Sequence, residues 1–381
     1  MRAVRHALFL GSVLSLAACG GGEVDRTVEA DATGRTQAPL HPAEPGRAIA
    51  DSYIVKVRDG ADARAVAAVA GVSPKHVYSV INGFAATLTP GQLTALRHQA
   101  DVEYLEQDQV FQANACQSTT HCNLDRIDQR ALPLDGTYCC NSTGAGVNVY
   151  IIDSGLQTTH PEFGGRAANV YDATGGTGAD CNGHGTHVAG IVGSVSYGVA
   201  KGVKLRGVRV LDCAGSGATS GVIAGIDWVR VNHLKPAVAN VSVGGPFSST
   251  LNTAVTNLAN AGVFTVAGAG NSGADACNYS PASAPAITTV GATTCTDSRI
   301  ASSNYGSCVD LYAPGSSVTS TWLSSGTNTL SGTSMAAPHV AGVGALYKAT
   351  YGDASQATVD SWLKTNATSL SFGKLLYKSS L

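Results

Sequence analysis

The stretch Gly332-Thr333-Ser334-Met335-Ala336-Ala337-Pro338 is the point around which the chain is organised. A glycine that permits a tight turn precedes a serine, and residues 335–348 are rich in Ala, Val and Leu, as in a buried helix. A serine in the first turn of such a helix lies beside free backbone N–H groups and the positive end of the helix dipole, which favour a developing negative charge. An N-cap serine would give the same local pattern. The stretch therefore indicates either a nucleophile or a cap.

The surrounding residues, 115–381, predict an α/β fold with a parallel sheet. Apolar runs alternate with small-residue helical stretches, which is the pattern of strands buried on both faces and joined by crossover helices. The expected strands are residues 147–152, 208–211, 238–243, 263–267 and 287–290, and the expected helices are 187–196, 220–231 and 250–261. In such sheets, function gathers at the carboxyl ends of the strands.

Three polar residues occupy such places. Asp153 and Asn271 each follow the end of a predicted strand, and His184 begins a helix between them. A serine nucleophile needs a base, which histidine provides near neutral pH, and the imidazole needs a carboxylate to fix its tautomer. The oxyanion needs N–H donors, which the Asn271 amide and the Ser334 backbone can supply.

Each residue also has a simpler interpretation. Asp153 and Asn271 are common turn residues, and His184 with His187 has the spacing of a zinc pair. No HExxH pattern or cysteine pair supports zinc, and the G-x-S-x-G motif of esterases is absent. The order Asp, His, Ser on one parallel sheet favours a serine nucleophile.

Composition limits the alternatives further. A length of 381 residues suggests about two domains, and 44% hydrophobic with 13% charged residues allows a large core. The net charge is −2 and no basic block occurs, which argues against a nucleic-acid partner.

The N-terminus has the pattern of an export signal over residues 1–19, with Arg2 and Arg5 before an apolar segment too short to span a bilayer. The segment ends in Leu16-Ala17-Ala18-Cys19-Gly20, which resembles a bacterial lipoprotein box, so we expect lipid on Cys19. An ordinary signal with an incidental cysteine is the alternative. Residues 20–50 are predicted to be a flexible linker.

Residues 51–114 predict a β-α-β-β-α-β order, a small ferredoxin-like unit. The predicted strands are 53–57, a pair within 77–88 around Asn82-Gly83, and 102–106; the predicted helices are 61–70 and 89–97. By itself this order also fits an unrelated α/β module.

Residues 51–381 resemble a subtilisin-family serine protease precursor of the proteinase K branch, close to its bacterial, aqualysin-like members. The resemblance is carried by Asp153-Ser154-Gly155, His184-Gly185-Thr186-His187, the stretch 332–338, Gly270-Asn271 and Asn278-Tyr279-Ser280-Pro281-Ala282. Tyr53-Ile54-Val55, Asn82-Gly83-Phe84 and Val102-Glu103-Tyr104-Leu105-Glu106 resemble the inhibitory propeptides. The resemblance implies a parallel-sheet subtilisin-like catalytic domain, 115–381, after a small α+β propeptide domain, 51–114. It assigns the nucleophile, base, orienting acid and oxyanion donor to Ser334, His184, Asp153 and Asn271.

The resemblance also implies that substrate binds as an added strand between two edges. The residues expected at these edges and in the first specificity pocket are Gly215, Ser216, Gly217, Ser242, Val243, Gly244, Ala267, Gly268 and Ala269. They are small and uncharged, so the pocket should accept apolar or aromatic side chains with weak discrimination. Helix–sheet packing is the other explanation for small residues here.

Structural calcium is expected at two places. The carbonyls of Pro285 and Ile287 with Asp310 resemble a calcium site of the family. A second candidate is a group of four oxygen donors of the kind that hard cations prefer, Asp125, Asp128, Gln129 and Asp135. Ordinary solvated carboxylates are the alternative in both cases.

Ten cysteines in an exported chain imply disulfides. By resemblance, Cys181 pairs with Cys213 and Cys277 with Cys308. The sequence leaves Cys116, Cys122, Cys139, Cys140 and Cys295 without assigned partners, and adjacent Cys139 and Cys140 are expected to bond elsewhere rather than to each other. If Cys19 carries lipid, nine remain and at least one has no partner within the chain.

The expected protein is an exported, broad-specificity serine endopeptidase that cleaves its own inhibited precursor after Asn114. The new N-terminus would be Ala115, and Phe111 would lie in an apolar pocket of the cleft. The expected partners are protein and peptide substrates and the chain's own propeptide. The mature enzyme is expected to be a secreted monomer, released from any lipid on Cys19. A surface lipoprotein that binds proteins without cutting them is the competing hypothesis, which a missing triad member would have favoured.

Overall fold

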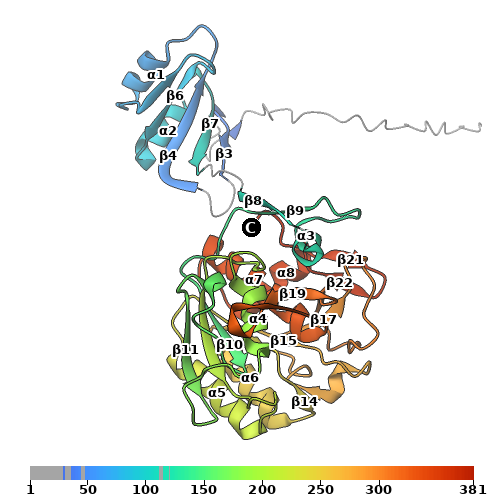
Figure 1. Cartoon of the computed structure of the whole chain (residues 1–381). Helices are drawn as coiled ribbons and strands as arrows, with labels where there is room; N and C mark the ends of the chain where they lie inside the picture. The colour runs from blue at the N-terminus through green and yellow to red at the C-terminus, as the bar shows by residue number, and fades with distance from the viewer. Residues whose placement is uncertain (1–28, 31–35, 44–47, 111–114, 120) are drawn as a thin grey trace, which may run out of the picture. The chain divides into compact units, whose positions relative to one another are not determined.

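The computed structural model describes residues 29–30, 36–43, 48–110, 115–119 and 121–381 (Figure 1). The chain divides into two compact units, residues 1–111 and 112–381. Each unit is described by itself. The export signal, Cys19 and the cleavage point after Asn114 lie outside the described residues.

The first unit is a five-stranded sheet with two helices, in the strand order β3-β7-β4-β6-β5. Its elements are β3 (Leu40–His41), β4 (Ala48–Val57), α1 (Ala63–Val69), β5 (His76–Tyr78), β6 (Gly83–Thr87), α2 (Pro90–Arg97) and β7 (Val102–Gln109), preceded by a separate pair, β1 (Glu29–Ala30) and β2 (Thr36–Gln37). The predicted β-α-β-β-α-β order is confirmed. The helix α2 begins where expected, because Thr89 and Gln92 form a reciprocal capping box around Pro90.

The predicted linker over residues 20–50 is wrong for residues 36–43. Strand β3 pairs in parallel with β7, where Leu40 lies opposite Leu105. Ala38 is 8% exposed; its N–H donates to the Arg97 carbonyl at the end of α2, and its carbonyl accepts from the Arg97 side-chain Nε at 2.9 Å. The Gly- and Pro-rich composition hid this strand, because pairing with a distant sheet edge leaves no local pattern.

The second unit is built on a nine-stranded sheet in the order β11-β12-β10-β13-β15-β17-β18-β22-β21. All neighbouring strands are parallel except the last pair. The strands of this sheet are β10 (Asn148–Asp153), β11 (Ala167–Asp172), β12 (Lys204–Arg209), β13 (Ala237–Val241), β15 (Phe264–Gly268), β17 (Thr288–Thr293), β18 (Leu311–Pro314), β21 (Thr368–Leu370) and β22 (Gly373–Leu375). The α/β fold with a parallel sheet is confirmed.

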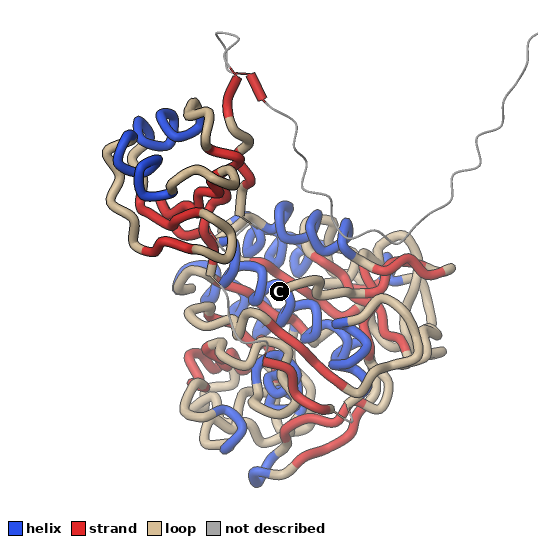
Figure 2. Tube along the Cα trace, turned by 90° about the horizontal axis from the view of Figure 1, so that it is seen from above, coloured by secondary structure: helices blue, strands red, loops and turns tan. Residues whose placement is uncertain are grey.

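Helices cover both faces of this sheet. They are α3 (Cys122–Asp128), α4 (His184–Gly193), α5 (Thr219–Asn232), α6 (Ser249–Asn260), α7 (Thr333–Tyr351) and α8 (Gln356–Asn366). Figure 1 shows α4 and α7 on one side and α5 and α6 on the other, and Figure 2 shows the strands running between the helices. Two buried apolar clusters correspond to these layers, one around α4 and α7 and one around α5 and α6.

Small antiparallel pairs complete the second unit. They are β8 (Ala115–Ser118) with β9 (Thr137–Cys140), β14 (Gly245–Pro246) with β16 (Tyr279–Ser280), and β19 (Val318–Thr321) with β20 (Thr327–Leu330). Among the described helices, none is long and apolar enough to cross a membrane.

Several predicted boundaries differ from those observed, and two of these differences have a clear local cause. The strand expected at residues 208–211 is residues 204–209, because the N–H groups of Val210 and Leu211 both donate to the Asp153 carbonyl as the chain leaves the sheet. The helix expected at 187–196 begins at His184, immediately after Gly183, whose positive φ of 105° ends the preceding loop.

Four disulfides staple the second unit. The pairs Cys181–Cys213 and Cys277–Cys308 are confirmed, and the remaining pairs are Cys116–Cys139 and Cys122–Cys295. Cys140 is a buried free thiol, so Cys139 does bond elsewhere and the odd cysteine of the described chain is Cys140.

Candidate active site

A cleft of about 840 Å³ lies at the carboxyl ends of the central strands. The lining includes His184, Asn271 and Ser334, contributed by α4, the loop after β15 and α7. The sheet places these groups together as the strand-end rule requires, although they are far apart in the sequence.

Asp153 lies behind His184 as the last residue of β10, and its side chain is 0% exposed. Its oxygens lie 2.8 and 2.9 Å from Nδ1 of His184, and the N–H of Ser154 donates to Oδ1 at 2.7 Å. This arrangement holds the proton of a neutral imidazole on Nδ1 and leaves Nε2 without a partner among the described residues.

Ser334 lies in the first turn of α7, which begins after Gly332. The N-cap alternative for Ser334 is wrong, because the cap is Gly332 and Ser334 Oγ points to another segment, donating to the Ser242 carbonyl at 3.4 Å. Gly332 has φ 151°, and a Cβ there would meet the Asn271 amide nitrogen at 3.2 Å. A glycine is therefore needed directly before the serine turn.

Asn271 is oriented by the residue that precedes Ser334. Its Oδ1 accepts hydrogen bonds from the Thr333 N–H at 2.9 Å and the Thr333 hydroxyl at 3.2 Å. With Oδ1 engaged, Nδ2 remains as a donor in the cleft beside the first turn of α7. Thr333 Oγ1 also accepts from the Gly270 N–H at 3.1 Å, which ties the two loops together.

The charge state of His184 is set by opposing effects. Burial lowers its pKa, but the charge of Asp153, the hydrogen bond to Asp153 and the charge of Asp180 raise it, and the net pKa lies above the ordinary value. The surroundings therefore favour the imidazolium form that a general base becomes on accepting a proton.

Two further histidines lie deep beside the site. Burial lowers the pKa of His187 to about 4, although its Nε2–H donates to the Asn328 carbonyl at 3.0 Å. Burial also lowers the pKa of His339 to about 4. Both rings are therefore neutral near pH 7.

Two short segments form opposite edges of the cleft. Of the predicted substrate residues, those that line it are Gly215, Ser216, Gly217, Ser242, Val243, Gly244, Gly268 and Ala269. Ala267 does not line it, because its side chain packs in the apolar cluster around α5 and α6 on one face of the sheet. The residue after it, Gly268, is the first of β15 to reach the cleft.

Several carboxylates of the two predicted calcium sites already accept hydrogen bonds from other groups of the chain. Among the described residues, no group of three or more His, Cys, Asp or Glu side chains is placed to hold a metal ion. Asp125 and Asp135 accept hydrogen bonds from backbone N–H groups of the loop 135–137, and Asp310 Oδ1 accepts from Lys364 Nζ at 2.7 Å.

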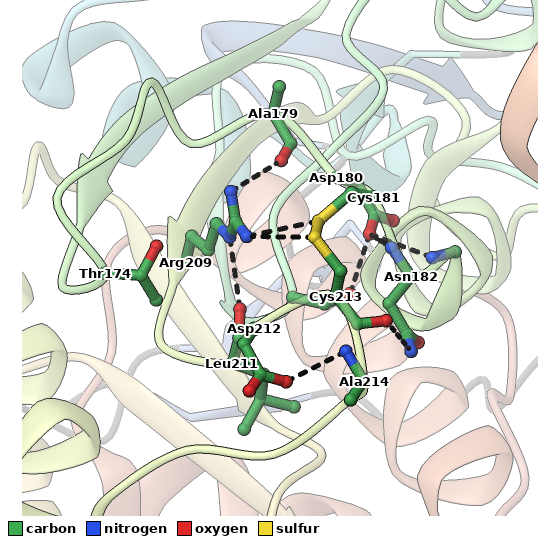
Figure 3. The surroundings of a disulfide bond; sticks show 12 residues. Thr174, Ala179, Asp180, Cys181, Asn182, Arg209, Leu211, Asp212, Cys213 and Ala214 are labelled. Atoms are coloured by element: carbon green, nitrogen blue, oxygen red, sulfur yellow. Dashed lines mark hydrogen bonds between the residues drawn. A yellow bond between two sulfur atoms is a disulfide. The ribbon is translucent and has the colours of Figure 1, made fainter.

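Sequence reasoning missed Asp180, which precedes the histidine motif and lies under its loop. Its carboxylate accepts hydrogen bonds from both flanking segments of the site. The only hint in the sequence was that Asp180 lies four residues before the predicted base, His184. The disulfide Cys181–Cys213 lies next to it and joins the His184 loop to the loop that carries Gly215 (Figure 3).

Comparison with known proteins gives two family matches. Residues 144–378 match the model described as "Subtilase family", and residues 52–114 match "Peptidase inhibitor I9". The chain is 54% identical over 303 residues to an extracellular serine proteinase of Thermus sp. (strain Rt41A), covering 78% of this chain and 74% of that protein. It is 51% identical to alkaline serine exoprotease A of Vibrio alginolyticus, covering 78% of this chain and 58% of that protein.

Similarity extends to fungal proteins and to a solved structure. Proteinase R of Parengyodontium album is 44% identical, with coverage of 88% of this chain and 90% of that protein. The crystal structure of a cold adapted subtilisin-like serine proteinase matches with a TM-score of 0.67 and 51% identity, covering 70% of this chain and 99% of that chain.

Proposed function

The chain belongs to the subtilase family, and we propose from its cleft how it acts as a secreted serine endopeptidase made as an inhibited precursor. One observation carries the mechanism: buried Asp153 bonds Nδ1 of His184, and His184 shares the cleft with Ser334. This is the base and orienting acid that a serine nucleophile needs.

In the proposed reaction, Ser334 Oγ attacks the peptide carbonyl while Nε2 of His184 takes its proton. Asp153 stabilises the resulting imidazolium without itself becoming protonated. The Asn271 amide and the Ser334 N–H hold the oxyanion. His184 then returns the proton to the leaving amine, and water repeats the sequence to release Ser334 from the ester. In this structure the Ser334 hydroxyl donates a long hydrogen bond of 3.4 Å to the Ser242 carbonyl. In the reaction this hydroxyl turns instead to Nε2 of His184, and such catalytic hydrogen bonds often form fully only with substrate bound.

Substrate is proposed to bind as a strand between the edge segments 215–217 and 242–244. The wall of the first pocket is made of Gly244, Gly268 and Ala269, which carry no charge. An apolar or aromatic side chain fits such a wall, and nothing there rejects similar side chains strongly.

Self-cleavage after Asn114 is supported by the inhibitor match, which ends at that residue. The mature enzyme would begin at Ala115, the first residue of β8. The severed first unit would remain bound as an inhibitor until digested. Any lipid on Cys19 would leave with it, and the mature monomer would be released.

Structural calcium is common in this fold, and we propose it here at the loop of Asp125, Asp128, Gln129 and Asp135. All four side chains offer oxygen donors, as calcium prefers, but the three carboxylates accept hydrogen bonds from backbone N–H groups in this structure and would have to turn toward one another to hold an ion. Burial and the neighbouring charges of Asp125 and Asp135 raise the pKa of Asp128 to about 6, although a backbone hydrogen bond and Lys378 oppose them. A bound cation would relieve this crowding of carboxylates.

The site of Pro285, Ile287 and Asp310 fits less well. Lys364 already neutralises Asp310, at 2.7 Å, and lines a hollow of about 390 Å³ together with both carbonyl residues. Calcium there would require Lys364 to turn fully to Asp360, which it also contacts at 2.7 Å.

The test is labelling with a fluorophosphonate, which reacts with an activated serine. We expect one adduct on the peptide that contains Ser334 in the mature enzyme, and none after Ser334→Ala. A folded protein without an adduct would instead favour a binding protein that does not cut.

A further inference from the structure

Asp180 is a carboxylate outside the triad with an unusual number of partners. It precedes the helix of His184 by one short loop and accepts five hydrogen bonds, some of which Figure 3 shows. Oδ1 accepts from Ser154 Oγ at 2.9 Å, Asn182 N at 3.0 Å and Gly183 N at 2.9 Å, and Oδ2 accepts from Thr186 N at 2.9 Å and Thr186 Oγ1 at 2.6 Å.

These bonds join the two segments that carry the acid and the base. Ser154 follows Asp153 directly, and its hydroxyl both donates to Asp180 and accepts from the Gly185 N–H at 2.9 Å. Thr186 belongs to the first turn of α4. The carboxylate is therefore a shared anchor for the end of β10 and the start of α4, and it fixes how His184 approaches Asp153.

The charge of Asp180 also acts on His184. The charged and titratable groups that influence this ring are Asp153, Asp180 and the neighbouring His187. His187, with a pKa of about 4, is neutral over most of the range in which His184 titrates. Among the described residues, the charges of two carboxylates, Asp153 and Asp180, raise the pKa of His184, and only Asp153 is hydrogen-bonded to the ring.

We propose that Asp180 is a positioning residue for the proteolytic reaction, which holds the His184 turn against Asp153 and supplies a second negative charge that favours the imidazolium. The proposal rests on the serine-protease function above. Its structural half acts on kcat, because a catalytic group displaced by about 1 Å costs on the order of 100-fold in rate. Its electrostatic half acts on the pH dependence, because protonated His184 is inactive as a base.

The experiment compares Asp180→Asn with Asp212→Asn in the mature enzyme. Asp212 is a matched control, since its carboxylate accepts hydrogen bonds from Ala214 N and Ser216 N in the neighbouring loop, and its charge is not among the causes that shift the pKa of His184. For Asp180→Asn we expect kcat to fall about 10- to 100-fold. We also expect the acid limb of kcat/KM to move to lower pH. For Asp212→Asn the limb should stay in place, whatever happens to KM.

An acid limb that does not move in Asp180→Asn, or one that moves equally in Asp212→Asn, would overturn the electrostatic half. Ser154→Ala keeps the charge and removes the link to Asp153, so it should lower kcat without moving the limb; unchanged kcat would overturn the positioning half.

A second measurement does not depend on self-processing. His184 is titrated by NMR in the full-length precursor carrying Ser334→Ala, with and without Asp180→Asn. A lower titration midpoint with Asn supports the proposal. An unchanged midpoint, or a precursor that no longer folds, would show that Asp180 serves the fold alone. Fluorophosphonate labelling of the wild-type enzyme tests the serine-protease function separately.

Discussion

The groups proposed to activate Ser334 come from three separate parts of the chain. They are the first turn of α7, His184 with its partner Asp153 at the end of β10, and the loop that carries Asn271. We expect Ser334→Ala to abolish proteolysis and self-cleavage while leaving the precursor folded. For the type enzyme of this family the loss in kcat is on the order of 10⁶. The measurement is single-turnover hydrolysis together with the size of the purified chain. Turnover near that of the wild type would remove Ser334 from the mechanism.

Asn271 offers a sharper test of geometry. Asn271→Ala should lower kcat by about 10²–10³ with little change in KM, because the lost donor serves the oxyanion. Thr333→Val is the graded control, since it removes the hydroxyl that helps to hold Asn271 but keeps the backbone N–H bond. It should lose much less activity. Equal losses in the two variants would mean that the Asn271 amide is not itself the donor.

Buried histidines predict acid lability. His187 and His339 have pKa values of about 4 in the fold, and about 6.5 is the ordinary value. The unfolded chain therefore binds more protons between these limits, and stability falls as pH drops from about 6.5 to 4. Each ring contributes on the order of 3 kcal/mol at most. Urea unfolding of the Ser334→Ala precursor at several pH values measures this. The slope should flatten in His339→Gln, and an equally steep slope there would exclude His339.

At the scale of elements, the sequence predicted the strands and helices whose own residues show a hydrophobic pattern. The apolar runs at β10, β13 and β15 were found because strands buried on both faces must be apolar throughout. The short edge strand β3 was missed because it is ordered by pairing with β7, which is far away in the sequence. The hairpin β19–β20 was missed because its strands are short and rich in Ser and Thr, so they lack the apolar run that marks a buried strand. The same limit applies to Asp180, whose partners come from two elements.

The proposed calcium site in α3 and the loop that follows it gives the prediction at the scale of elements. Chelation should lower the melting temperature by about 5–10 °C if calcium is bound at about 100 times its Kd. Asp128→Asn should shrink that difference, whereas Asp212→Asn should leave it unchanged. A melting temperature that does not respond to chelator would remove both proposed calcium sites.

At the scale of the whole molecule, the resemblance to subtilisin-type precursors predicted the two units, the triad and two disulfide pairs. It could not pair Cys122 with Cys295. These two residues are 173 positions apart in the sequence, and they meet only because α3 packs against the loop after β17. Nor could it show that the Ala267 side chain packs in the apolar core instead of lining the cleft, since this depends on which face of the sheet the side chain points to.

The boundary between the units gives the last prediction. N-terminal sequencing of the active form should find Ala115 as the first residue. A start more than about three residues away would refute the proposed junction.

The four disulfides have a further effect once the enzyme is active, because each molecule is then a possible substrate for the other active molecules around it. Loop tips are where nicking concentrates, and a loop must open locally before it can thread through another molecule's cleft. The cross-links hold loops on either side of His184, and the Cys277–Cys308 pair holds two more near the cleft. The disulfides restrict this local opening even where they add little to the free energy of global unfolding. The lifetime of the secreted enzyme in concentrated solution should therefore depend on oxidation, and reduced molecules should be consumed first by their oxidised neighbours.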